Sequence, residues 1–256
     1  MSKFFKFNFR LKLTISMLSV VALTGIVAII IGITIINKNI IRDAYEVVKN
    51  TLDATYFMYN EKMNTKKKLL AYVAKREDII YSTKNKQRIY LYKKLQEIKN
   101  EFNLDILNIT DHKGNIIIRS NSINQYGDNV SQDKIVNWIL KNRKTCSGSD
   151  LVNQYTLKKE SIDLVRKSQI RIIPTPRSRN IKKAYEKRAM MLKAGSPIWF
   201  NGKMIGVIYG AILINNNFKL VDSFKNLLFK KHKIDKDHLS TTTIFLEDVR
   251  IATNVL

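Results

Sequence analysis

Cysteine occurs once in the 256 residues, at Cys146, and histidine three times, at His112, His232 and His238. One cysteine cannot form a disulfide within the chain, and it cannot supply the several thiolates of a metal cage. The histidines are dispersed and belong to no HExxH motif and to no grouping of serine, histidine and aspartate. We therefore expect a protein that is not an enzyme and that has no catalytic residue, metal site or cofactor.

Acidic residues are few, because the chain has 21 Asp and Glu against 45 Lys and Arg, and its formal charge is +24. Such an excess is typical of proteins that attract phosphate in nucleic acid or anionic lipid. The lysines are scattered among many Ile and Asn residues, as in a coding sequence rich in A and T. The chain has no single stripe of arginines interleaved with aromatic residues. We interpret the charge as a solvated surface and expect no nucleic acid partner.

Charged side chains are also missing from residues 13–36, which are mostly Ile, Val, Leu and Ala. At about 1.5 Å per residue, a helix of this length crosses a hydrocarbon layer of roughly 30 Å. Residues 1–12 carry four basic and no acidic side chains, and short basic flanks stay on the cytoplasmic side. The sequence predicts a cytoplasmic tail, a transmembrane helix in contact with membrane lipid, and an extracytoplasmic remainder of a plasma-membrane or inner-membrane protein.

A cleaved signal peptide is the alternative for this segment. Its apolar region would be about 7 to 15 residues long and would end in small residues, whereas this run is longer and ends in Gly-Ile-Thr-Ile-Ile.

A second apolar run, residues 204–214, is too short to return across the membrane. It follows the turn pair Asn201-Gly202 and predicts the second strand of a β-hairpin, so we expect a single crossing.

Two helical patterns follow the membrane segment. Apolar residues recur by three and four from Ile41 to Val73, which predicts one long helix that leaves the membrane. A second amphipathic helix is expected from Ile89 to about residue 103. The long stripe fits either a coiled-coil seam between two protomers or a face that packs on the protein's own sheet. We expect a homodimer through this helix, and we take residues 37–103 as a helical stalk.

The sequence period then changes to that of strands. Residues 104–110 and 115–120 are strand-like runs joined by the turn 111–114. Ser131 is placed to cap a short helix, residues 143–151 have the composition of a loop, and residues 161–167 fit neither helix nor strand clearly. The further elements expected are strands at 170–173, 190–194, 197–200, 204–214, 243–246 and 249–254 and a helix at 218–231. These elements predict an α+β fold with an antiparallel sheet.

Long helices that lead from a membrane segment into such a sheet resemble the layout of the PAS-like Cache sensory domains. The resemblance rests on residues 111–120 (DHKGNIIIRS), on residues 126–128 (YGD), and on residues 196–208, from SPI through NGK to IGVI. Residues 173–177, 213–222 and 243–255 are similar to the subgroup with two Cache modules. Proteins of that subgroup are sensor histidine kinases of two-component systems and methyl-accepting chemotaxis receptors.

The resemblance implies a membrane-distal, ligand-binding module at residues 104–218 and the start of a truncated membrane-proximal module at residues 219–256. The second transmembrane helix and the kinase or chemotaxis output domain of such receptors are not in the sequence. The function expected is therefore an extracytoplasmic, small-ligand sensing module of a bacterial transmembrane signalling receptor that lacks its output domain.

A ligand would enter a concave pocket between the sheet and the loops over it. Arg119, Arg171 and Arg177 are the candidate ligand-binding cations, because a guanidinium can hold the carboxylate of a small acid or amino acid in bidentate fashion. Trp199 and Tyr209 are candidate walls. The alternative for each arginine is an exposed surface charge, and for the two aromatics it is ordinary core packing.

Two other functions use different features of the chain. A membrane-tethered binder of anionic polymers would use the net charge, and its affinity would fall steeply with salt. A basic membrane anchor with no small-molecule pocket would use only the long helix, and no small molecule would change its stability.

Overall fold

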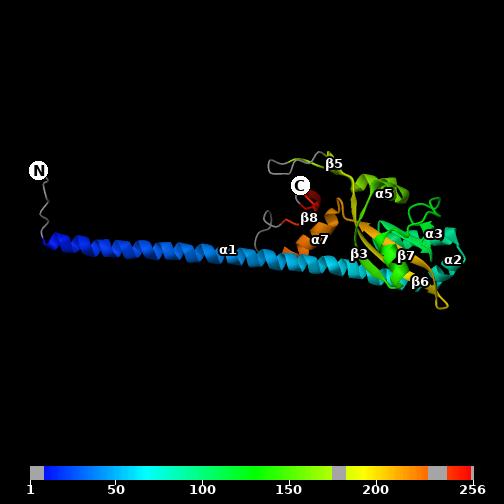
Figure 1. The fold of residues 1–256 in the computed structure, drawn as a ribbon, viewed down its shortest axis with the longest axis horizontal. Helices are drawn as coiled ribbons and strands as arrows, with labels where there is room; N and C mark the ends of the chain where they lie inside the picture. The colour runs from blue at the N-terminus through cyan, green and yellow to red at the C-terminus, as the bar shows by residue number, and fades with distance from the viewer. Residues whose placement is uncertain (1–8, 175–182, 230–240, 255–256) are drawn as a thin grey trace. The chain divides into compact units, whose positions relative to one another are not determined.

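A computed structural model of the chain describes residues 9–174, 183–229 and 241–254. It divides into two compact units, residues Met1–Ala54 and Thr55–Leu256. Helices and antiparallel sheets are combined in the second unit (Figure 1), which confirms the predicted α+β fold class.

Helix α1, Phe9–Val73, contains the predicted membrane segment. Its most apolar window has a mean hydropathy of 2.7, and no part of that window is buried against the protein. Among the described residues, α1 is the one helix that is long and apolar enough to cross a membrane. The helix runs without a break to Val73, as the spacing of apolar residues predicts.

The main sheet has five antiparallel strands in the order β2-β1-β7-β6-β3. The strands are β1 (Ile106–Asp111), β2 (Ile116–Arg119), β3 (Cys146–Val152), β6 (Ala189–Phe200) and β7 (Lys203–Leu213). Because side chains alternate across a strand, each strand supplies residues to both faces of this sheet.

One face of the sheet is covered by the end of α1, by α2 (Glu77–Lys84) and by α3 (Arg88–Glu101). Helix α3 agrees with the amphipathic helix predicted from Ile89 to about residue 103, whereas α2 was not predicted. The core on this face is formed by Leu70, Val73, Ile79, Leu91, Leu95, Ile98, Leu107, Ile109, Ile118, Ile198 and Ile208. Tyr59 of α1 also hydrogen-bonds Ser149 of β3 at 2.7 Å, which ties the helix to the edge of the sheet.

The hairpin of β6 and β7 confirms the interpretation of the second apolar run. Phe200 pairs with Lys203, and the two residues between them, Asn201 and Gly202, have φ of 48° and 75°. Positive φ at both central positions is the requirement of a type I′ turn, which asparagine and glycine meet. The strand before the turn is one continuous element, where the sequence analysis expected two strands.

The prediction of a loop at residues 143–151 is wrong, because strand β3 occupies most of this segment. This strand pairs with β6 from Cys146 opposite Gly195 to Val152 opposite Ala189. Its sequence, CSGSDLV, is rich in residues with low strand propensity. The apolar partner strand, rather than the local sequence, makes this segment extended.

Asp133, not Ser131, caps the helix that follows the β2 loop. Helix α4, Lys134–Asn142, begins after Asp133, whose Oδ1 accepts hydrogen bonds from the backbone N–H groups of Ile135 and Val136. Ser131 instead donates its hydroxyl to Asn129. An aspartate two residues along the chain therefore replaces the predicted serine cap.

The second face of the sheet is covered by α4, α5 (Gln154–Glu160) and α6 (Ile162–Ser168). Residues 161–167, which fitted neither helix nor strand clearly in the sequence, lie almost entirely in helix α6. At the start of this helix, the hydroxyl of Ser161 accepts a hydrogen bond from the backbone N–H of Asp163. The core on this face contains Ile106, Ile116, Val136, Val152, Leu157, Leu164, Met191, Ala211 and Leu213.

Five further elements complete the described chain. They are β4 (Ile170–Arg171), β5 (Tyr185–Glu186), α7 (Phe218–Phe229), β8 (Thr243–Leu246) and β9 (Val249–Thr253). β4 pairs with β5, and β8 pairs with β9 as the sequence predicts. Leu220 and Phe224 of α7 pack against Leu246, Val249 and Ile251, and this cluster also includes Leu192 of the main sheet.

Candidate functional site

A pocket of about 460 Å³ lies on the sheet face that α4, α5 and α6 cover. Its floor comes from strands β1, β2, β3, β6 and β7, and its walls come from residues 128–134 and from α5. We call it the sheet pocket. It lies between the sheet and the segments over it, where the sequence analysis expects ligand to enter.

Strand register brings three polar side chains together under this pocket. Arg119 of β2 pairs with Asn108 of β1, and Asn108 pairs with Tyr209 of β7. Residues paired directly across strands have neighbouring side chains on one face. The strand order β2-β1-β7 thus places these three side chains in one row across the sheet. Tyr209 is far from the other two in the sequence, so no local sequence pattern predicts the row.

The second row of the floor is Ile106, Ala211, Lys193 and Gly148, on strands β1, β7, β6 and β3. Ile106, Ala211 and Lys193 line the pocket, so that its floor changes from apolar to cationic along this row. Ala211 is small and lines the pocket, whereas Ile135 of α4 packs over Gly148.

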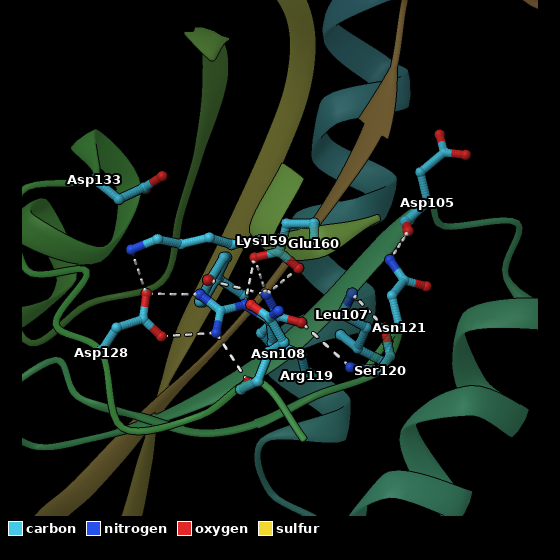
Figure 2. A network of polar contacts seen from close by, with 12 residues as sticks. Asp105, Leu107, Asn108, Arg119, Ser120, Asn121, Asp128, Asp133, Lys159 and Glu160 are labelled. Atoms are coloured by element: carbon cyan, nitrogen blue, oxygen red, sulfur yellow. Dashed lines mark hydrogen bonds and ion pairs between the residues drawn. The ribbon is translucent and has the colours of Figure 1, made fainter. Parts of the chain in front are cut away.

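Arg119 is held on both sides by carboxylates (Figure 2). Its Nε donates to Glu160 at 2.9 Å, and its two terminal nitrogens donate to Asp128 at 2.7 and 3.0 Å. A fourth hydrogen bond goes to the carbonyl oxygen of Gln125 at 2.9 Å. The guanidinium is therefore fixed in a bidentate pair with Asp128, a geometry that adds both energy and orientation.

Asn108 connects Glu160 to Tyr209. Its amide nitrogen donates to both oxygens of Glu160 at 2.9 Å and to the hydroxyl oxygen of Tyr209 at 3.0 Å. Because the tyrosine oxygen accepts this bond, its own proton must point elsewhere, toward Glu160 or toward the pocket that Tyr209 lines.

Burial and charge shift the pKa values of this network in different directions. The hydrogen bond from Arg119 lowers the pKa of Asp128 to about 2, so Asp128 is ionised near neutral pH. Burial raises the pKa of Glu160, and Arg119 and Asn108 oppose that change. Burial, together with the charge of Glu160, raises the pKa of Tyr209 well above its usual value. Tyr209 therefore keeps its proton and can donate a hydrogen bond.

A second ion cluster forms the opposite end of the pocket. The ammonium group of Lys193 donates to Asp133 and, at 2.9 Å, to Asp150, and its side chain is only 5% exposed. Lys134 pairs with the other oxygen of Asp150 at 3.1 Å. Asp133 both caps α4 and binds Lys193, so this cluster fixes the start of α4 to strands β3 and β6.

The charges around the pocket balance. Four cationic and four anionic side chains line it, namely Arg119, Lys134, Lys159, Lys193, Asp128, Asp133, Asp150 and Glu160. Lys159 reaches Asp128 at 3.2 Å and lies 4.9 Å from the ring centre of Tyr155. The formal charges of this lining sum to zero, although the chain as a whole carries a formal charge of +24.

The structure brings together two of the five predicted ligand-binding residues, Arg119 and Tyr209, which both line the sheet pocket. Arg171 is exposed on β4, away from it. Arg177 lies outside the described residues. Trp199 lines a different cavity of about 420 Å³, near the end of α1.

Asn108, Glu160 and Lys193 were not among the predicted site residues. A signal existed for two of them, because Asn108 and Lys193 are polar residues inside strand-like apolar runs. A buried polar residue in a strand requires a partner. Glu160 carried no such signal, since it ends a helix that the sequence analysis did not identify.

Residues 9–174, 183–229 and 241–254 contain no group of three or more His, Cys, Asp or Glu side chains that could hold a metal ion. The carboxylates of the sheet pocket are each engaged by a cationic side chain.

No protein-family model and no curated protein matches the chain. Among solved structures, the periplasmic domain of Vibrio cholerae LuxQ has a TM-score of 0.49 at 12% identity and covers 80% of this chain and 78% of its own. A domain described as a sensory box/GGDEF family protein from Vibrio parahaemolyticus has a TM-score of 0.44 at 12% identity and covers 67% of this chain. The extracellular domain described as that of the histidine kinase vpHK1S-Z8 has a TM-score of 0.42 at 11% identity and covers 70% of this chain.

The chain spans 60% and 58% of the second and third of these structures. At identities of 11–12% and TM-scores below 0.5, what the chain does has to be argued from its own residues.

Proposed function

We propose that the chain is the membrane-anchored sensing module of a signalling receptor and that the sheet pocket binds its ligand. The ligand is a small molecule with a carboxylate, and a zwitterion of the amino acid type fits best. The module has no catalytic role, and the binding event would pass to an output domain of the histidine kinase or chemoreceptor type that is not part of this sequence.

The charge balance of the sheet pocket carries this proposal. A zwitterion can exchange with an existing ion pair, because its carboxylate can approach Lys159 or Lys134 and its ammonium group can approach Asp128 or Asp150. Lys134 and Lys159 are 75% and 33% exposed, so they can reorient without the cost of breaking a buried pair. A polyanion or a polyamine would meet as many repelling as attracting charges.

The rigid side chains define the shape into which such a ligand fits. Arg119, Glu160 and Lys193 are buried and fully engaged, so they serve as fixed walls rather than as mobile ligands. Tyr209 adds its buried side chain to the floor. Binding groups that are already positioned need not be ordered when the ligand arrives, which favours affinity.

The membrane segment gives the proposed location. Residues 13–36 lie in α1, and the basic flank before them favours an N-terminus in the cytoplasm and a second unit outside the cell. On this proposal the protein crosses the inner or plasma membrane once, and the sheet pocket faces the outside of the cell.

The part of α1 within the first unit that follows the membrane segment supports a homodimer. Ile41, Tyr45, Val48 and Leu52 are spaced by three and four, and each is at least 53% exposed. An apolar stripe at this spacing is typical of a coiled-coil seam. We propose that a second copy of the chain covers it.

Thermal unfolding of the full chain in neutral-lipid nanodiscs tests the function. A library of amino acids, small carboxylates and amines should contain zwitterions that raise the melting temperature with concentration, because a ligand of the native state stabilises it by mass action. The effect should persist at high salt. A rise with heparin or polyphosphate alone, lost as salt increases, would favour an anionic-polymer binder and contradict the sensor.

A further inference from the structure

A second cavity, of about 1000 Å³, lies on the sheet face opposite the sheet pocket. Residues 57–66 of α1, the end of α3 and the segment after it, strands β6 and β7, and α7 surround it. We call it the helix cleft. All of these residues belong to the second compact unit of the chain.

The floor of the helix cleft is apolar. Leu192 and Ile212 are paired across β6 and β7, and Leu104, Leu220 and Phe224 extend the same floor. Leu192, Leu220 and Phe224 are already packed, with exposures of 4%, 4% and 2%. Phe57 and Leu227 at the mouth are 68% and 67% exposed, and this apolar surface gains stability when apolar material covers it.

The α1 wall of the helix cleft is cationic. Lys62 and Lys66 are one helical turn apart and both line the cleft. The ammonium group of Lys66 donates to the carbonyl oxygen of Phe102 at 2.6 Å, and within the described residues neither lysine forms an ion pair with a carboxylate. Burial, and then the charge of Lys62, lower the pKa of Lys66. An anion beside these two lysines would stabilise the charged form of Lys66 and so oppose both effects.

The two acidic residues of the lining do not supply that anion. Glu61 accepts a hydrogen bond from Asn64 on the same helix. Asp105 accepts from the backbone N–H of Leu213 at 2.7 Å, and burial raises its pKa. Lys219, at the start of α7, adds another cation to the lining.

We propose that the helix cleft binds an amphipathic monoanion, a molecule with one carboxylate head and an aliphatic tail, as in a free fatty acid. The head lies between Lys62 and Lys66, and the tail passes over the half-buried Ile212 and covers Phe57 and Leu227 at the mouth. The site is separate from the sheet pocket, and it does not depend on the function proposed for that pocket.

Equilibrium dialysis of radiolabelled decanoate against the full chain in phosphatidylcholine nanodiscs tests the proposal, with empty nanodiscs as the background. The expected result is saturable binding with one decanoate for each chain. Affinity should rise roughly twofold to fourfold for each methylene from octanoate to dodecanoate, because each methylene buries apolar surface. Neither 1-decanol, which lacks the charge, nor acetate, which lacks the tail, should compete at the same concentration.

Lys66→Gln should weaken decanoate binding roughly fivefold or more, because it removes a charge-assisted hydrogen bond but keeps a donor for Phe102. Lys68→Gln is the matched control, since Lys68 is exposed on the same helix and does not line the cleft. Melting temperatures without ligand show whether both variants fold.

Three results would overturn the proposal. They are equal binding of decanoate and decanol, an affinity that Lys66→Gln leaves unchanged in a folded protein, and binding that appears only when the nanodisc contains anionic phospholipid. The last result would assign the cleft to a bilayer headgroup instead of a free acid. A zwitterion that binds the sheet pocket should remain bound in Lys66→Gln, which separates failure of this site from failure of the sensor.

Discussion

The Nε atom of Arg119 lies 2.9 Å from Oε1 of Glu160, and both side chains are buried, with exposures of 2% and 6%. Strand β2 supplies the arginine and helix α5 supplies the glutamate, so this pair connects the floor of the sheet pocket to its wall. A pair this deep is far more costly to break than to replace.

Arg119→Met should destabilise the fold by about 3–5 kcal/mol, because Glu160 would keep a buried charge without its partner. The double variant Arg119→Met/Glu160→Gln should be more stable than Arg119→Met, since the glutamine is neutral and still accepts from Asn108. Melting temperatures of the full chain in detergent give both values. A double variant that melts below Arg119→Met would contradict this account of the pair.

Asp128→Asn should reduce stability in a way that depends on pH. The folded-state pKa of Asp128 is about 2, below its ordinary value of 3.8, so its carboxylate stabilises the fold above about pH 4 and loses that effect as pH falls toward 2. We expect a loss of about 1–2 kcal/mol at pH 7 that shrinks in acid. Melting curves at pH 7, 4 and 3 measure it.

Asp163→Asn is the control for that measurement, because Asp163 is 65% exposed in its pair with Lys167. Its effect should be small at every pH. If Asp128→Asn had the same cost at pH 7 and pH 3, the assigned role of the Arg119 pair in lowering the pKa of Asp128 would be wrong.

Lys193 and Lys134 bind the same aspartate but should differ greatly in importance. Lys193→Met should cost about 2–4 kcal/mol, since it leaves Asp133 and Asp150 without their buried partner. Lys134→Met should cost about 0.5 kcal/mol or less, because the Lys134 side chain is 75% exposed. Thermal unfolding of the two variants side by side decides whether the cluster holds α4 against the sheet; equal losses would show that it does not.

Gly206 is needed for close approach of β7 to β1. A Cβ atom built at this position would lie 2.1 Å from the carbonyl oxygen of Thr110, a backbone atom that can move only with its strand. Gly206→Ala should therefore cost about 3 kcal/mol or more. Gly202→Ala in the hairpin turn meets no atom within 4 Å and should cost only about 1 kcal/mol, from its φ of 75°. If both variants unfold at the same temperature, the contact with Thr110 is not the reason that position 206 requires glycine.

The local sequence predicted the elements that are set by the conformational preferences and apolar spacing of their own residues. The spacing of apolar residues identified α1 and α3, and Asn201-Gly202 identified the hairpin of β6 and β7. Strand β3 was missed because Cys146 to Asp150 have no strand preference of their own, and pairing with β6 makes them extended. The cap was misplaced because Ser131 and Asp133 are both good caps, and only the contact of Asp133 with Lys193 distinguishes them.

The candidate site was less predictable than the fold. Arg119 and Tyr209 were predicted as pocket residues. Their partners are Asn108 of β1 and Glu160 at the end of α5, which lie 52 positions apart in the sequence. Their meeting follows from the strand order β2-β1-β7 and from the way α5 packs on that face. Pairings over such distances have no signature in a single sequence.

The central claim is that a small zwitterion binds in the sheet pocket, and a plug in its mouth tests this most directly. Thr156 is exposed on α5 and lines the pocket, whereas Lys158 is exposed on the same helix and does not. The measurement is the ligand-dependent rise in melting temperature of Thr156→Trp, Lys158→Trp and the unaltered chain. We predict that Thr156→Trp abolishes the rise and that Lys158→Trp retains it. A rise of the same size in all three proteins would place the ligand elsewhere and contradict the account.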